Sequence, residues 1–115
     1  MTDRAEPTPV VNVLALARPI RSAHQHVEVG ACNDHRAVLA VNTEPFPWHH
    51  HPNSDELFLV LEGTLRLELE GGHRVDLRPS DTWVVPAGLV HRTTPLGRCV
   101  NLVFERADAE TRFVE

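Results

Sequence analysis

The chain has 115 residues with a hydrophobic content of 42%, which is enough for one compact core and too little for two ordinary domains. Its formal net charge of −5 comes without a basic block, and this argues against nucleic acid as a partner. All eleven basic residues are Arg and Tyr is absent, which excludes Schiff-base chemistry on a lysine and a phenolic proton donor.

The first residues predict a tail rather than a packed element. Residues 1–9 carry Pro7 and Pro9 among polar residues, which indicates a flexible arm before a single domain over residues 10–115. No signal-peptide layout is present, and no apolar stretch reaches the ~18–20 residues that span a bilayer. We therefore expect a cytoplasmic protein with no membrane partner. Residues 10–17 fit either a strand or a short helix capped by Asn12 and ended before Pro19, and both alternatives stay open.

The rest of the chain has the pattern of a β-sandwich or β-barrel, with short apolar runs between turn signals. The run from Glu56 to Leu61 is apolar on both faces, residues 65–69 alternate between apolar and polar, and Glu62-Gly63 joins the two strands. Further strands are expected at residues 28–32, 37–41, 75–77, 83–85 and 100–104. No helical period follows position 26, so the fold class is predicted to be all-β.

A histidine-rich segment is the first candidate for chemistry. On an extended chain His49 and His51 share one face, with roughly 6.6 Å of rise between them, while His50 faces away. Two imidazoles at this spacing can bind one ion. A solvated polar turn is the alternative reading of three adjacent histidines, and it is the better one while they are considered alone.

Glu56 favours the metal-site reading over the polar-turn reading, because it is the first residue of the predicted buried strand, after the turn of residues 52–55. An inward carboxylate needs a counter-charge in a low-dielectric interior, and a metal ion supplies one where no Lys exists. The corner Pro86-Ala87-Gly88 can return the chain toward the same place and present His91. The sequence therefore predicts one metal site made of His49, His51, Glu56 and His91.

Two strings carry a family resemblance: His49-x-His51-x4-Glu56-x6-Gly63 resembles the first cupin motif, and Pro86-x-Gly88-x2-His91 resembles the core of the second. The resemblance covers about half of the chain and is similar to that of small single-domain bacterial cupins. It implies a double-stranded β-helix or jelly-roll barrel, here with a short N-terminal helix as one alternative. Thr43, Ser80 and Pro95 depart from the family pattern, and none of the three is a family metal ligand.

Three imidazoles and one carboxylate suit a single divalent ion, namely Zn²⁺, Fe²⁺, Mn²⁺, Ni²⁺ or Cu²⁺, and the sequence does not rank these. Open coordination positions would allow a small oxygen-bearing molecule to bind, and the resemblance implies oxygenase, isomerase or decarboxylase chemistry. A non-catalytic binding or sensing module is the alternative, and a metal that only staples a small barrel is a third reading. We also expect a homodimer, because pairing exposed strand edges stabilises a short barrel.

No catalytic residue is identified beside the metal site. His24, His26, His35 and His73 are read as surface residues, and Glu105 is read as solvated at the end of its strand. Asp55 is expected to stabilise its own turn. Phe46 and Trp48 flank the histidine segment and could line the mouth of a pocket, while Cys32 and Cys99 are read as small buried or half-buried hydrophobes.

Overall fold

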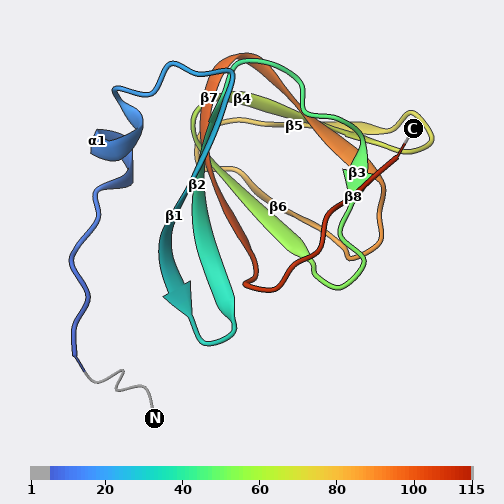
Figure 1. Cartoon of the computed structure of the whole chain (residues 1–115). Coiled ribbons are helices and arrows are strands. Elements are labelled where there is room, and N and C mark those ends of the chain that lie inside the picture. Colours follow the sequence, from blue (N-terminus) through green and yellow to red (C-terminus); the bar gives the residue numbers. More distant parts are fainter. Residues whose placement is uncertain (1–5, 115) are drawn as a thin grey trace.

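A computed structural model of the chain describes residues 6–114, which form one short helix and an antiparallel sheet of eight strands (Figure 1). The elements in chain order are α1 (Val13–Ala17), β1 (His24–Cys32), β2 (His35–Asn42), β3 (His49–His50), β4 (Glu56–Leu69), β5 (Arg74–Leu77), β6 (Thr82–Val85), β7 (His91–Arg106) and β8 (Arg112–Phe113). The prediction of an all-β fold is confirmed.

The two longest strands, β4 and β7, organise the fold. Strand β7 pairs with β2 along its C-terminal half and with β4 along most of its length, and its first residue also pairs with β3. Strand β4 continues the sheet to β5 and β6. The sheet therefore curls into an open barrel whose concave side encloses an interior (Figure 1).

A bulge divides strand β4 into two parts that turn different sets of residues inward. Its buried residues are even-numbered from Glu56 to Val60 and odd-numbered from Leu65 to Leu69, because the register against β7 shifts between residues 60 and 64. Gly63 takes a left-handed conformation there, with φ +78°, and a Cβ at this position would lie 2.3 Å from the Arg98 carbonyl oxygen. The separate strands predicted for residues 56–61 and 65–69 are thus one bulged strand, half-buried on its outer face.

Two apolar clusters stabilise the barrel. The larger one fills the interior beside β4 and consists of Phe58, Val60, Leu65, Leu67, Leu77, Val85, Cys99 and Val103. The smaller one lies under α1, where Ala17 packs with Leu39, Val41 and Val100 on the outer face of the sheet. Cys99 is buried as predicted, whereas Cys32 is exposed at the end of β1.

The N-terminal segment resolves the choice between strand and helix. Residues 13–17 are helical, and the Asn12 side-chain oxygen accepts a hydrogen bond from the Ala15 backbone N–H at 3.0 Å. Of the arm predicted for residues 1–9, residues 1–5 lie outside the described part, and residues 6–9 form neither helix nor strand. Within residues 6–114, no helix is long and apolar enough to cross a membrane.

Candidate metal centre

The structure brings the four predicted residues together in the barrel interior. His49 on β3 faces His91 on β7 in register, His51 follows β3 directly, and Glu56 is the first residue of β4. One potential ligand atom from each residue lies within 4.8 Å of the others. We call these four residues the His–Glu group; their exposed fractions are 5% for His49, 6% for His51, 8% for Glu56 and 1% for His91.

Hydrogen bonds between two loops hold the His–Glu group in position. The backbone N–H of Gly88 donates to the His51 carbonyl oxygen at 2.9 Å, and the Ala87 N–H donates to Asp55 Oδ1, also at 2.9 Å. Gly88 has a φ of +85°, which favours glycine at this corner. The loop before β7 is therefore bound to the loop before β4, and Asp55 connects the two loops instead of stabilising only its own turn.

Backbone carbonyls hold each imidazole by its Nδ1 atom. The Nδ1 atoms of His49, His51 and His91 lie 2.7, 2.9 and 2.8 Å from the carbonyl oxygens of Pro47, Glu110 and Leu89, respectively. A carbonyl only accepts hydrogen bonds, so each Nδ1 carries a proton, and in its neutral form such a ring presents an Nε2 lone pair. This arrangement orients the rings as metal-binding histidines are oriented.

Acceptor atoms therefore converge in the middle of the group. Glu56 Oε1 lies 3.2 Å from His51 Nε2 and 3.2 Å from His91 Nε2. Two nitrogen lone pairs and a carboxylate oxygen at this separation repel one another unless a proton on an imidazole or a metal ion lies between them. Among the described residues, buried His51 Nε2 has no aligned hydrogen-bond partner. The group thus fits a metal ion, which would satisfy all of these acceptors at once.

Without a metal, protons balance these charges in part. Burial opposes ionisation of Glu56, but pairing with His51 and His91 outweighs it and lowers the pKa of Glu56 to about 2. Burial likewise opposes the charged form of His51, yet pairing with Glu56 raises the pKa of His51 above its usual value. Glu56 is therefore ionised at neutral pH, and its charge favours the protonated form of His51.

His49 behaves differently from His51 because it has no carboxylate against its ring. Burial is the main cause that lowers the pKa of His49 to about 4, and repulsion from His91 and His51 adds to it. His49 is therefore neutral at pH 7. A neutral imidazole is the form that binds a metal ion.

A cavity of about 370 Å³ opens from the His–Glu group. Phe58, Val38 and Val103 line its inner wall, and Phe46 and Phe113 line the part near His49. The expectation for Phe46 at the pocket is met. Trp48 lies outside this cavity, where the Arg92 guanidinium stacks on its ring at 4.9 Å.

The polar wall of the cavity contains residues that the sequence did not reveal. Glu105 is not solvated: it is 7% exposed, lines the cavity, and accepts a hydrogen bond from Arg36 Nε at 3.0 Å. His24 and His26 also line the cavity from β1. Alternation along β1, β2 and β7 could have indicated these residues, because His24, His26, Arg36 and Glu105 all fall on the inward side of their strands.

Comparison with known proteins identifies the family. The model of the Cupin domain (Cupin_2) matches residues 35–101, more than half of the chain, so the protein belongs to the cupin family. The chain is 42% identical over 104 residues to the uncharacterized protein YdbB of Bacillus subtilis (strain 168), covering 90% of this chain and 92% of that protein.

Solved structures agree with this assignment. A cupin-2 domain containing protein from Shewanella frigidimarina matches with a TM-score of 0.79 and 25% identity, covering 84% of this chain and 94% of its own. Oxalate oxidase in complex with the substrate analogue glycolate matches with a TM-score of 0.64 and 21% identity, covering 71% of this chain and 47% of its own. At that identity the second likeness shows the fold alone.

Proposed function

We propose that His49, His51, Glu56 and His91 bind one divalent metal ion, and that the adjoining cavity binds a small oxygen-bearing molecule as the substrate of a metal-dependent reaction. The convergence of Nε2 atoms on a buried carboxylate, with each Nδ1 held by a backbone carbonyl, supports this proposal. If the histidines had only a structural role, their Nε2 atoms would not need to face one carboxylate.

The residues of the site would divide the work. The His–Glu group would hold the ion with four protein ligands and leave one or two positions open for the substrate oxygen. A bound divalent ion would polarise such an oxygen, and the cupin resemblance implies oxygenase, isomerase or decarboxylase chemistry for this step. The apolar wall formed by Phe58, Val38 and Val103 would exclude water around the reacting atoms.

A non-catalytic binding or sensing role is the second candidate, and one observation favours it. Glu105 is the buried carboxylate of the cavity outside the His–Glu group, and Arg36 already binds it. Two hydrogen bonds from the Arg36 guanidinium fix this carboxylate in an ion pair, which favours a binding role for it over an acid–base role. In this case the cavity would hold its ligand without converting it.

Metal removal and replacement test the proposal. The protein is stripped with a chelator, loaded with Zn²⁺, Fe²⁺, Mn²⁺, Ni²⁺ or Cu²⁺ in turn, and assayed for binding and turnover of small hydroxy and keto acids. We expect the stripped protein to stay folded and at least one metal to restore ligand binding. An unfolded stripped protein whose metal-loaded form binds none of these acids would instead establish the staple reading.

We also propose that two copies associate. Val84 on β6 and Phe104 on β7 flank Leu57 of β4 on the outer face of the sheet and are 44% and 40% exposed. Leu14 and Leu16 on α1 are 38% and 37% exposed. Burial of such apolar surface stabilises a two-fold interface. Light scattering of the purified protein tests this, with twice the chain mass expected and the mass of a single chain contradicting it.

A further inference from the structure

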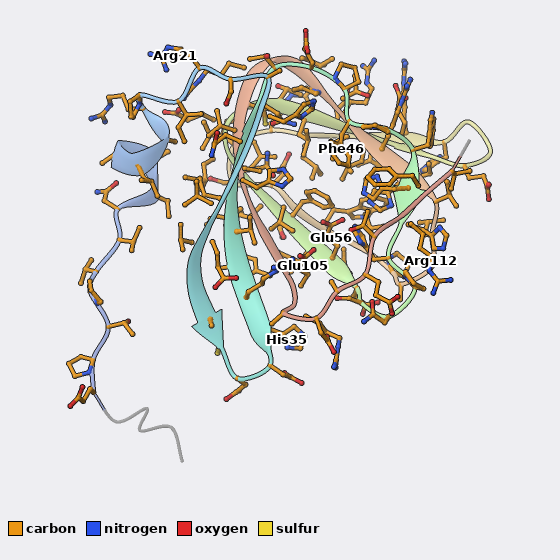
Figure 2. All side chains as sticks on the ribbon, viewed as in Figure 1. Arg21, His35, Phe46, Glu56, Glu105 and Arg112 are labelled. Atoms are coloured by element: carbon orange, nitrogen blue, oxygen red, sulfur yellow. The ribbon has the colours of Figure 1, made fainter. Side chains whose placement is uncertain are left out.

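The Arg36–Glu105 pair lies directly beside the proposed metal site. The ladder between β4 and β7 ends at the pair Leu57 with Phe104, and Glu56 and Glu105 are the next residues past that end on the two strands. Both side chains are buried and line the cavity. Figure 2 shows the two carboxylates within the space enclosed by the strands. Because Glu105 lines the same cavity as His49, His51 and Glu56, a molecule bound at the metal would be within reach of it.

Arg36 fixes the orientation of Glu105 and leaves one oxygen free. Arg36 lies opposite Glu105 in the β2–β7 register, and its Nε and Nη2 atoms both donate to Oε2, at 3.0 and 2.5 Å. Among the described residues, Oε1 of Glu105 receives no hydrogen bond. The pair therefore presents a fixed acceptor to the cavity rather than a guanidinium free to bind an anion.

Carboxylates outnumber cationic side chains around this position, histidines aside. The charged residues lining the cavity, other than histidines, are the carboxylates Glu28, Glu56 and Glu105 and the single guanidinium of Arg36. Glu28 also lies 3.8 Å from Arg36 Nη1, so Arg36 is shared between two carboxylates. A second negative group on the bound molecule would thus meet repulsion at Glu105, whereas a hydroxyl or ammonium group would meet an acceptor.

We infer that Glu105, positioned by Arg36, selects the substrate class: a small molecule with one oxygen ligand for the metal and a hydrogen-bond donor next to it, such as a hydroxy monocarboxylate. A dicarboxylate is disfavoured. This inference rests on the proposed function, because it requires an ion with open positions in the His–Glu group. Glu105 is a specificity residue and not a ligand of the ion, since it lies outside the cluster of four ligand atoms.

Glycolate and oxalate are the probes, because they share a two-carbon skeleton and differ only in a hydroxymethyl against a second carboxylate. The protein is loaded with Co²⁺, and the affinity for each probe is measured from the change in the cobalt absorption spectrum. The measured quantity is the ratio of the two affinities. Comparing this ratio between wild type and variant removes the difference in the intrinsic strength with which the two probes bind cobalt.

In Glu105→Gln we expect unchanged cobalt content and a shift of the affinity ratio toward oxalate by about tenfold or more, because the charge repulsion is gone. Glu28→Gln is the matched control. It removes the same charge from a side chain that is 56% exposed, and it should shift the ratio much less. Should Glu105→Gln lose its fold, the double variant Arg36→Met/Glu105→Met removes the pair together and must shift the ratio in the same direction, by less because no unpaired guanidinium is left to attract oxalate.

The possible failures are distinguishable. An unchanged ratio in Glu105→Gln, equal shifts in both Gln variants, or cobalt-loaded protein that binds neither probe would overturn the inference while leaving the metal site intact. Wild-type protein that takes up no cobalt would overturn the proposed function itself, and the inference with it.

Discussion

The barrel interior has two ends of opposite character, and strand β4 runs through both. The apolar end is the cluster around Val60, Leu65 and Leu67, which are fully buried. The polar end holds the His–Glu group and the Arg36–Glu105 pair. Burial stabilises the fold at the apolar end, whereas it removes water from charges and lone pairs at the polar end. The contrast indicates that the stability of the chain resides at one end and its chemistry at the other.

The largest effect on stability is expected at the apolar end. Leu67→Ala removes a fully buried side chain and should lower the free energy of unfolding by about 2–5 kcal/mol, because it leaves a cavity in the core. Urea unfolding of the metal-free protein measures the change. Metal content per folded chain should stay the same, and a matching loss of metal would break the contrast between the two ends.

The largest effect on metal binding is expected at the polar end. His51→Ala should lower metal affinity on the order of 100-fold or more, since the loss of even an outer contact to a ligand costs about 10–100-fold. His50→Ala is the control, because His50 is adjacent in sequence and outside the His–Glu group. Competition with a coloured chelator measures both affinities; equal affinities in the two variants would rule out His51 as a ligand.

The free energy of unfolding of the metal-free protein should depend on pH, because titratable groups are buried at the polar end. The pKa of His49 is lowered to about 4, so the unfolded chain takes up a proton between pH 6.5 and 4 that the folded chain does not. Stability of the metal-free protein should therefore fall as pH falls through this window, and ionised Glu56 adds a further fall between pH 4.5 and 2. The raised pKa of His51 acts in the opposite sense, because its contribution is complete below pH 6.5 and is lost as pH rises above it.

Urea midpoints measured in the presence of a chelator between pH 6.5 and 4.5 test this dependence on pH. His49→Gln should show a weaker fall than wild type, because glutamine does not titrate. Equal slopes in the two proteins would show that His49 titrates normally in the folded chain.

The smallest effect is expected in a turn that belongs to neither end. Ser80 has a φ of +76°, a left-handed conformation that is strained for a residue with a Cβ. Ser80→Gly should raise the free energy of unfolding by about 0.5–1 kcal/mol, the relief of strain being offset in part by the greater freedom of glycine when unfolded. Thermal unfolding checks the sign, and a loss of stability would mean that the Ser80 side chain contributes more than its strain costs.

The placement of the residues within each of the two motifs could be predicted from the sequence, because the geometry inside a motif is local. Alternation along an extended chain places His49 and His51 together, and the cost of an unpaired buried carboxylate explains Glu56. Ser80 also adopts the turn geometry that the family pattern assigns to glycine. In contrast, the sequence did not reveal that Pro86-Ala87-Gly88 binds the loop before β4 through Asp55 and His51, because that contact depends on tertiary structure.

The errors have a common cause, which is long-range pairing. Strand β7 begins at His91, whereas only residues 100–104 were predicted, and its pairing with β4 continues through Pro95 and across two register shifts. Glu105 was read as solvated because its partner, Arg36, lies 69 positions away in the sequence. Residue pairs of this separation leave no local pattern.

Elemental analysis of protein purified without added metal tests the central claim most directly. The account predicts about one divalent ion per chain in the wild type and a near-complete loss in a folded variant with all four residues of the His–Glu group replaced. Absence of metal from both proteins, or equal metal in both, would contradict the assignment of the His–Glu group as a metal centre.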